Sequence, residues 1–452
     1  MDKLNIELPR QVAFAIARLE QNGFEAYVVG GCVRNTLLNL AANDWDMTTS
    51  ATPEQMLACF SDFRVIETGI KHGTLTVLID GMSLEITTYR DDGVYLDNRH
   101  PEKVTFSKHI EDDLKRRDFT VNAMAYHPDR GLVDLFGGRE DLGRRLIACV
   151  GEPSARFGED GLRILRALRF ASVLDFEIDP KTADAIHNCR TLLKNIAAER
   201  IREEFCKLLC GRGAVRILRA YHDVIAVFLP ELEACVGFAQ NCKYHCYDVF
   251  EHTLHALQES NGELILRLAI LFHDIGKPHC YTEDENGGHF KGHGAVGTEL
   301  TREILRRLRF DNRTLERVTA LVEYHDREIP PIAKSVKRLM TRFSDEDIGV
   351  LMEIKRCDRL AHADGYNTPS DALSEIPRLV LQIREQNECL SLKTLAVSGA
   401  DLLALGIPKG KEIGAVLNRL LDAVLDGDLP NDREKLLSFV PQIRETEKGE
   451  RP

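Results

Sequence analysis

The stretch GGCVRNTLLNLAANDWDMTTS, residues 30–50, decides the fold and the chemistry of the first part of this chain. Two glycines follow the apolar run EAYVV, and a short helical pattern follows them. A glycine turn after a strand lets the backbone approach a phosphate closely, and the helix behind it offers unpaired N–H groups. Gly30 and Gly31 are therefore predicted to hold a triphosphate, with Arg34 in the first helical turn neutralising its charge.

Two aspartates flank the tryptophan at the end of this stretch. Asp44 and Asp46 are two residues apart on a predicted strand, so their side chains point to one face and Trp45 to the other. Two such carboxylates can bridge two Mg²⁺ ions, which activate an attacking hydroxyl and stabilise a leaving pyrophosphate. Glu85, in SLEITTYR, could add a third carboxylate from a neighbouring strand. A D-x-D alone usually marks solvated aspartates, but this combination favours nucleotidyl transfer.

The segments around this stretch predict a small α+β unit with a mixed sheet. The runs GTLTVLID and MSLEITTYR are typical of strands, and Asp80-Gly81 between them is a strong hairpin signal. Thr52 and Pro53 open a helix as its N-cap and first residue. Residues 91–112 are polar and turn-rich, and we expect a mobile loop there. From about residue 140 onward helical periodicity dominates.

Composition limits the class of protein. The chain has 452 residues, 44% hydrophobic, and no apolar run reaches the roughly 20 residues of a membrane span. Its twelve cysteines form no C-x-x-C pair, and the N-terminus lacks a signal-peptide pattern, so we expect a reduced, cytoplasmic protein without membrane contact. Cys242 and Cys246 lack a second ligand pair, which favours inert cysteines over a zinc site.

The net charge of −12 argues against a generic nucleic-acid binder, but the charge is uneven. Residues 107–220 hold 21 Lys and Arg against 18 Asp and Glu, so that 21 − 18 gives +3. A local basic surface on an acidic protein is compatible with a specific RNA partner held through few phosphate contacts.

A second constellation follows the predicted loop. The segment DLKRRDFTVNAMAY spans residues 113–126, and GEDGLRILRALRF spans residues 158–170. In the latter, Asp160 and Arg163 are three residues apart, so on a helix they would be surface neighbours. Asp160 accepts and Arg163 donates hydrogen bonds, which matches the amine and ring nitrogen of cytosine and adenine but not uracil or guanine. For an isolated D-x-x-R, a surface ion pair worth about 0.2–0.5 kcal/mol is the better interpretation.

Together these motifs resemble the class II tRNA nucleotidyltransferase and poly(A) polymerase family, which has GG-x-VRD-x-LL…D-x-D, RRDFTxNAMA and EDxxRxLRAxRF. The chain departs from that pattern at Asn35, where the family usually has aspartate. The resemblance implies a polymerase-beta-like head, Mg²⁺ as cofactor, CTP and ATP as substrates and tRNA as partner. It also implies nucleotide contacts by Arg117, Asp118, Asn122, Asp160, Arg163, Arg166 and Arg169.

A third constellation lies further along the chain. His273 and Asp274 come late in the apolar run ILFHDIGKP, with His252 upstream and Asp358 far downstream. This order resembles the HD phosphohydrolase superfamily, named for its adjacent His and Asp, and predicts a divalent metal: Mn, Ni, Fe or Mg. A single His on an apolar helix is usually a core residue, but the ordered series is less easily explained that way.

Two further histidines could extend this site. His293, in KGHGAVG, and His325, in EYHDREIP, could supply ligands to a second metal. Ions held there could activate water to hydrolyse a phosphoester.

The end of the chain, SGADLLALGIPKGKEIGAVLNRLLDAVLDGDLPND at residues 398–432, resembles the C-terminal segment of these tRNA enzymes. The resemblance implies contact with tRNA through shape and phosphates. The fold expected is an α+β head followed by a mostly helical body. We expect four domains: a catalytic head (1–140), a base-recognition neck (141–225), an HD metal-binding domain (226–370) and a tRNA-binding body and tail (371–452).

The leading hypothesis is template-independent CCA addition to tRNA, with phosphohydrolysis at the HD site as an added activity. Poly(A) polymerase, or addition of CC or A alone, is the nearest alternative. The loop at 91–112 favours full CCA addition, because switching from C to A needs a movable element. Another alternative is an HD phosphohydrolase with an inactive polymerase half, and a non-catalytic RNA-binding protein is a further one. Intact Asp44, Asp46, Asp118, Asp160 and Arg163 count against both. The oligomeric state is left open.

Overall fold

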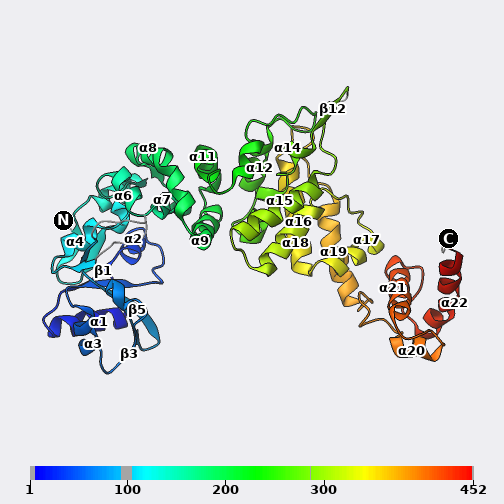
Figure 1. The fold of residues 1–452 in the computed structure, drawn as a ribbon, viewed down its shortest axis with the longest axis horizontal. Coiled ribbons are helices and arrows are strands. Elements are labelled where there is room, and N and C mark those ends of the chain that lie inside the picture. The colour runs from blue at the N-terminus through cyan, green and yellow to red at the C-terminus, as the bar shows by residue number, and fades with distance from the viewer. Residues whose placement is uncertain (1–5, 93–103, 286, 450–452) are drawn as a thin grey trace. The chain divides into compact units, whose positions relative to one another are not determined.

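A computed structural model of the chain describes residues 6–92, 104–285 and 287–449. The chain divides into two compact units (Figure 1). Unit 1 comprises Met1–Glu233 and Arg307–Phe310, and unit 2 comprises Ala234–Arg306 and Asp311–Pro452. Unit 1 contains a mixed sheet with helices, and unit 2 is almost entirely helical. The predicted fold class, an α+β head followed by a helical body, is confirmed.

The core of unit 1 is a seven-stranded sheet with the order β3-β4-β5-β2-β1-β8-β9. Strands β2 and β5 run parallel, and the other neighbours run antiparallel, so the sheet is mixed as predicted. The strands are β1 (Ala26–Val29), β2 (Asp46–Thr49), β3 (Arg64–Ile66), β4 (Thr74–Ile79), β5 (Met82–Thr88), β8 (Met124–His127) and β9 (Gly131–Asp134).

Local sequence signals produce the predicted boundaries in this unit. Asp80 and Gly81 have φ of 45° and 81°, the left-handed conformation that a two-residue hairpin turn requires. Helix α3 (Pro53–Cys59) begins at a capping box. In this box the Thr52 hydroxyl oxygen accepts from the Gln55 N–H at 3.4 Å, and Gln55 Oε1 accepts from the Thr52 N–H at 2.9 Å.

The remaining elements of unit 1 are mostly helices. They are α1 (Arg10–Gln21), α2 (Gly31–Leu37), α4 (Ile110–Lys115), α5 (Gly138–Arg144), α6 (Pro153–Glu159), α7 (Leu162–Leu174), α8 (Pro180–Cys189), α9 (Ala198–Leu209), α10 (Ala214–Ala220) and α11 (His222–Ile225). Short 3₁₀ turns occur at Ile70–His72, Thr120–Asn122, Arg190–Asn195 and Pro230–Cys235, and β10 (Leu146–Ile147) pairs with β11 (Glu177–Ile178).

The stretch predicted as a loop, 91–112, is partly ordered. Strands β6 (Arg90–Asp92) and β7 (Val104–Phe106) pair antiparallel, and α4 begins at Ile110. The prediction of a loop over the full stretch was therefore wrong at both ends, because the flanking residues pair with each other. Residues 93–103, where mobility was predicted, lie outside the described part of the chain.

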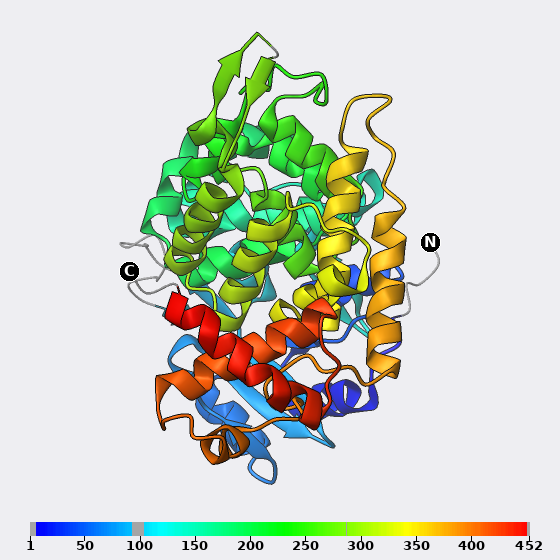
Figure 2. The ribbon, with the colours of Figure 1, turned by 90° about the vertical axis from the view of Figure 1, so that its right-hand side faces the viewer.

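Unit 2 is built from α12 (Val249–Gln258), α13 (Leu264–Phe272), α14 (Lys277–Cys280), α15 (His293–Arg307), α16 (Asn312–Tyr324), α17 (Ala333–Arg342), α18 (Asp345–Leu360), α19 (Ala372–Glu385), α20 (Gly399–Ala404), α21 (Lys411–Asp426) and α22 (Arg433–Gly449). Between α14 and α15, β12 (Thr282–Asp284) pairs antiparallel with β13 (Gly287–His289). Figure 2 shows α21 and α22 side by side, where Leu402, Val416, Leu420 and Leu436 form a buried core.

Within the described residues, no helix has both the length and the apolar character needed to cross a lipid bilayer.

Candidate functional site

Three carboxylates gather at one end of the head sheet. In the parallel pairing of β2 with β5, Asp46 lies directly beside Glu85, and both side chains are exposed. Asp44 is also exposed, but it precedes the strand, because β2 begins at Asp46. The prediction that both aspartates lie on the strand is corrected in this detail. Trp45 between them is buried, and its Nε1 donates to the Ala42 carbonyl at 3.0 Å.

The electrostatics of this cluster indicate a cation. Asp46 reaches solvent, but the protein around its carboxylate removes part of its hydration and raises its pKa; the negative charges of Glu85 and Asp44 raise it further, and Arg117 partly opposes them. Like charges side by side on neighbouring strands are destabilising unless something neutralises them. Carboxylate oxygens are the ligands that Mg²⁺ prefers, so the donor set fits a hard divalent ion.

The glycine turn lies at the end of β1. Gly30 has φ of 79°, and its N–H donates to the Met124 carbonyl at 3.1 Å. A Cβ at Gly30 would stand only 3.1 Å from Nη1 of Arg117, so a side chain there would push the guanidinium away. Helix α2 begins at Gly31, earlier than the sequence predicted, because the second glycine of the pair is already helical. The turn therefore leaves room for Arg117 beside the backbone.

Arg34 is buried and held by two neutral amides. Its Nη1 donates to Asn122 Oδ1 at 2.5 Å, and its Nε and Nη2 donate to Asn35 Oδ1 at 3.1 and 2.8 Å. Burial and the nearby charge of Arg169 lower its pKa to about 10. Asn35, which departs from the family pattern, thus orients the guanidinium without neutralising it.

Asp118 is tied to the helix that carries the other arginines. Its Oδ2 accepts from Arg166 Nε at 2.8 Å, and its Oδ1 accepts from Asn122 Nδ2 at 3.2 Å. Burial alone would raise the pKa of Asp118, but Arg166 and the hydrogen bonds outweigh burial and lower it to about 2. Asp118 is therefore an ionised anchor for Arg166.

An aromatic ring lies among these arginines. The guanidinium carbons of Arg34, Arg166 and Arg169 stand 5.0, 5.5 and 3.8 Å from the centre of the Phe170 ring. Arg169 Nε also contacts Glu204 Oε2 at 2.5 Å, from α9. The sequence did not point to Phe170 or Glu204 as site residues, although Phe170 ends the quoted segment GEDGLRILRALRF.

The structure corrects the geometry expected for Asp160 and Arg163. Asp160 has extended backbone, with φ of −139°, between α6 and α7, so the two residues are not neighbours on one helix surface. Asp160 Oδ1 instead accepts from the Leu162 N–H at 3.0 Å, and its Oδ2 accepts from Arg200 Nη2 at 3.1 Å.

Arg163 is buried and turned toward other partners. Its Nη1 donates to Glu159 Oε2 at 2.5 Å and to the Arg156 carbonyl at 3.3 Å, and its Nη2 donates to the Arg116 carbonyl at 3.0 Å. Neither Glu159 nor Arg200 was named from the sequence. The pair predicted to read the base is therefore held apart by a separate partner for each member.

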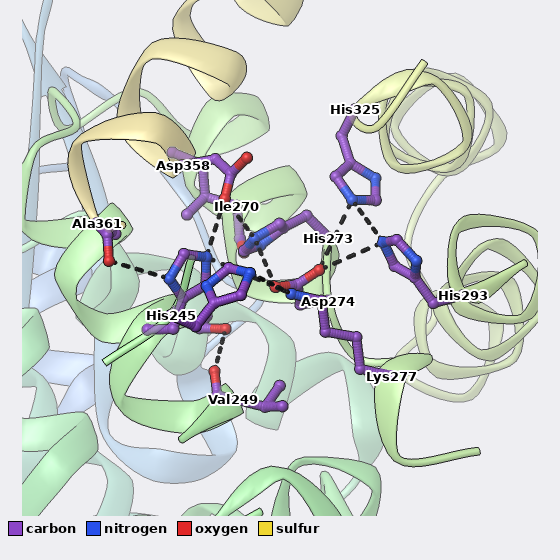
Figure 3. Close-up of polar contacts among 12 residues, drawn as sticks. His245, Val249, Ile270, His273, Asp274, Lys277, His293, His325, Asp358 and Ala361 are labelled. Atoms are coloured by element: carbon purple, nitrogen blue, oxygen red, sulfur yellow. Dashed lines mark hydrogen bonds and ion pairs between the residues drawn. The ribbon is translucent and has the colours of Figure 1, made fainter. Parts of the chain in front are cut away.

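The third predicted constellation also comes together, in unit 2. Two ligand sets share Asp274: His252, His273 and Asp274 form one, and Asp274, His293 and His325 form the other. Asp274 Oδ2 lies 3.2 Å from His273 Nε2, and Asp274 Oδ1 lies 3.5 Å from His293 Nε2. Figure 3 shows His293 and His325 pointing toward Asp274. Asp358 Oδ1 completes the first set at 2.9 Å from His252 Nε2.

The backbone fixes how these histidines present their nitrogens. In each of the four histidines, Nδ1 faces a backbone carbonyl. The pairs are His252 with Ala361 at 3.2 Å, His273 with Ile270 at 2.7 Å, His293 with Phe290 at 2.8 Å and His325 with Val322 at 2.6 Å. A carbonyl only accepts, so Nδ1 must carry a proton, and Nε2 is the nitrogen that offers a lone pair when the ring is neutral. This is the arrangement by which proteins orient metal-ligating histidines.

One contact and one pKa indicate that the cluster stabilises positive charge. Nε2 of His293 and Nε2 of His325 face each other at 3.1 Å, which is repulsive unless a cation or a proton lies between them. Burial lowers the pKa of His273, but Asp274 and Asp358 overcome burial and raise it to about 10. Imidazole and carboxylate together suit a divalent transition metal.

The cluster opens into a pocket of about 760 Å³. The pocket has further cationic and imidazole groups that the sequence reasoning did not name. Lys277 Nζ lies 2.6 Å from Asp274 Oδ2, and His245 and His362 line the same wall, with ring centres 4.5 Å apart. These residues could have been found from the sequence, because they lie in HDIGKP, CKYHC and RLAHADG, near the predicted ligands.

Family models match three segments of the chain. Residues 26–148 match "Poly A polymerase head domain", residues 175–235 match "Probable RNA and SrmB- binding site of polymerase A", and residues 295–440 match tRNA nucleotidyltransferase domain 2.

Individual relatives match over nearly the whole length. A CCA-adding enzyme of Limosilactobacillus fermentum is 34% identical over 429 residues, 95% of either chain. One of Enterococcus faecalis is 34% identical over 98% of this chain and 97% of its own. The crystal structure of the Bacillus stearothermophilus CCA-adding enzyme in complex with CTP superimposes with a TM-score of 0.76 at 29% identity, covering 97% of this chain and 98% of that one.

Proposed function

We propose that this chain, which belongs to the family of CCA-adding enzymes, adds cytidine, cytidine and adenosine to the 3′ end of tRNA. The observation that carries the proposal is the presence of two features in unit 1. Exposed Asp46 and Glu85 lie side by side on parallel strands with Asp44 next to them, and a cluster of arginines surrounds Phe170. Carboxylates hold metal ions and arginines hold a triphosphate, so unit 1 has both parts that nucleotidyl transfer requires.

Members of this family use a divalent metal. We propose Mg²⁺, held by Asp44, Asp46 and Glu85, because three neighbouring carboxylates, two of which raise the pKa of Asp46, offer oxygen ligands and excess negative charge. Bound there, Mg²⁺ would supply charge neutralisation for the attacking 3′-hydroxyl and the leaving pyrophosphate.

The arginines of unit 1 divide into two kinds in this proposal. Arg166 and Arg169 are paired with Asp118 and Glu204, which fix their positions. Arg34 donates its hydrogen bonds to neutral amides and forms no direct ion pair with the described residues, so its charge can act on the triphosphate. Gly30 and Gly31 keep the backbone close to that position. Asn122 and Asp118 lie between these arginines and orient them.

Base choice is proposed for Asp160 and Arg163 at the start of α7. An Asp160 oxygen would accept from the amine of cytosine or adenine, and uracil and guanine would present a carbonyl there instead. Arg163 must leave Glu159 to donate to the base, so the bound state differs from the arrangement seen here. The switch in partner would make selection part of nucleotide binding.

The test is extension of tRNA transcripts that end before C, after CC and after CCA. Each is incubated with Mg²⁺ and one radiolabelled nucleoside triphosphate, or with CTP plus ATP. Addition of C, C and A followed by a stop is expected. Long A tails on any RNA would assign a poly(A) polymerase instead, and CC or A alone would assign a partial task. No incorporation on any transcript would overturn the proposal.

Residues 371–452 are proposed as the body and tail that hold tRNA, residues 141–225 as the base-recognition neck and residues 226–370 as an HD domain. The buried core of Leu402, Val416, Leu420 and Leu436 gives the tail a folded surface to present. Truncation before Gly399 is expected to raise the KM for tRNA and leave the KM for CTP unchanged. An unchanged KM for tRNA would contradict this role.

A second activity, phosphoester hydrolysis, is proposed for the histidine cluster in unit 2. The pre-set Nε2 lone pairs and the shared Asp274 favour it, since they could hold two divalent ions, Mn, Ni, Fe or Mg. Ions bound there would supply Lewis acidity to activate water and a phosphate oxygen. Lys277 would keep Asp274 ionised and oriented.

Bis(4-nitrophenyl) phosphate and 4-nitrophenyl phosphate are suitable substrates for this test, with each metal in turn. We expect metal-dependent hydrolysis that His273→Ala abolishes, with tRNA extension unchanged in that variant. Hydrolysis that survives His273→Ala, or none with any of the metals, would overturn this second activity.

A further inference from the structure

We infer that Asp113 is a positioning residue for nucleotide binding, acting by aiming Arg117 at the triphosphate. The inference rests on the proposed nucleotidyl transfer in the head and assigns a role to a buried acid outside the residues discussed for that reaction. Asp113 lies in the last turn of α4, and its side chain is fully buried.

Asp113 holds two neighbouring arginines with its two oxygens. Oδ1 accepts from Arg116 Nε at 3.0 Å and from Arg116 Nη2 at 2.7 Å. Oδ2 accepts from Arg117 Nη2 at 3.1 Å. Burial would raise the pKa of Asp113, but the charges of Arg117 and Arg116 outweigh it and lower the pKa. The acid is therefore ionised where only these two cations compensate its charge.

Arg117 stands where a triphosphate would lie. Its Nη1 is 3.1 Å from the position of a Cβ on Gly30, beside the glycine turn, and its charge lowers the pKa of Asp46. Arg117 Nε is buried and has no hydrogen-bond partner among the described residues. Asp113 thus holds Nη2 of the guanidinium, and Nη1, which lies beside the glycine turn, can donate to a ligand.

The two arginines held by Asp113 have different tasks. Arg116 donates two hydrogen bonds to Asp113. Its backbone carbonyl accepts from Arg163 Nη2 at 3.0 Å, which connects this segment to α7. Arg117 has a single hydrogen bond to Asp113 and points to the glycine turn. Asp113 therefore accepts two hydrogen bonds from Arg116 and one from Arg117. The single bond to Arg117 orients its guanidinium toward the glycine turn.

The test is steady-state kinetics of CTP and ATP incorporation by Asp113→Asn, Arg117→Gln and the double variant. Asn keeps the size of Asp but loses the charge. The KM for both nucleotides should rise about tenfold in Asp113→Asn, with kcat changed less than about threefold, because a ground-state contact is weakened. Inhibition by pyrophosphate should weaken by a similar factor, since Arg117 contacts phosphates. Glu111→Gln, exposed on the same helix, is the matched control and should behave as wild type.

The double variant separates this role from a general structural one. If Asp113 acts through Arg117, Asp113→Asn adds nothing to Arg117→Gln, whereas independent effects would multiply. A wild-type KM in Asp113→Asn, multiplying effects or unchanged pyrophosphate inhibition would overturn the inference. Should Asp113→Asn fail to fold, Asp113→Glu carries the same comparison, because it keeps the charge and displaces it by one methylene. Absence of incorporation by the wild type would instead mean that the proposed function has failed.

Discussion

In the head, the carboxylates of Asp46 and Glu85 stand exposed on adjacent strands, whereas in unit 2 the side chains of His252, His273 and Asp274 are buried among helices. The exposed set repels itself and has few hydrogen bonds to fix it. The buried set is fixed, since each imidazole donates one N–H to a backbone carbonyl. The difference teaches that protein partners hold the side chains of the second set in place, whereas those of the first set lack such support.

The substitution with the largest expected effect removes the residue that both histidine sets share. Asp274→Ala should lower the affinity of both sets for divalent metal by more than about 100-fold. Metal analysis after dialysis should then find about two ions in the wild type and almost none in the variant. CTP incorporation into tRNA should not change. Retention of metal by the variant would show that the buried histidine sets in unit 2 do not depend on Asp274, and it would contradict the contrast with the exposed carboxylates of the head.

A smaller effect is expected at Asp160, the proposed base-reading residue. Asp160→Ala would remove the acceptor proposed to distinguish an amine from a carbonyl, so discrimination against UTP and GTP should fall by about 10- to 100-fold. The ratio of kcat/KM for CTP to that for UTP measures this. Arg200→Ala, which removes the partner of Asp160, should give a weaker change in the same direction. Unchanged ratios in both variants would assign base choice to other residues.

The self-repulsion of the head carboxylates predicts a pH effect. The charge of Glu85 raises the pKa of Asp46, so Glu85→Gln should lower that pKa. Asp46 then stays ionised at lower pH, and the acid limb of kcat/KM at limiting Mg²⁺ should move to lower pH, whatever the height of the profile. A limb that stays in place, or moves to higher pH, would contradict the like-charge cluster.

The smallest effect concerns stability and separates the two units. Thr52→Ala removes the N-cap of α3 and should cost about 1 kcal/mol of unfolding free energy. Trp45 is the single tryptophan of the chain and is 8% exposed, so its fluorescence reports unfolding of the head.

Ser344→Ala removes the matching cap of α18 in unit 2 and is the control. It should leave the tryptophan transition in place and shift only the helical circular dichroism. If Thr52→Ala left the tryptophan transition unchanged, or Ser344→Ala moved it, the two units would not unfold as separate regions.

Much of the head could be predicted because its signals are local. The Asp80-Gly81 turn, the Thr52 cap and the glycines after β1 each act through backbone geometry within a few residues. The sequence also predicted that Glu85 could add a third carboxylate from a neighbouring strand, and the register of β2 with β5 places it beside Asp46. The order of histidines and aspartates likewise predicted the members of the second cluster.

The partners of these residues could not be predicted, because packing between distant segments selects them. The i,i+3 rule for Asp160 and Arg163 holds only within a continuous helix, and the chain leaves helical geometry at Asp160. Arg163 then takes Glu159, and Asp160 takes Arg200 from 40 residues away. Glu204 and Asp113 are acids in basic or amphipathic motifs, and only the fold reveals which arginines they hold.

The most direct test of nucleotidyl transfer at the head carboxylates compares the wild type with an Asp44→Ala, Asp46→Ala double variant. Both are incubated with Mg²⁺, CTP and ATP on a tRNA transcript that lacks the terminal CCA. The wild type should add three nucleotides and stop, and the double variant should add none while it keeps its tryptophan unfolding transition. Incorporation by the folded double variant would contradict the assignment of the reaction to Asp44 and Asp46.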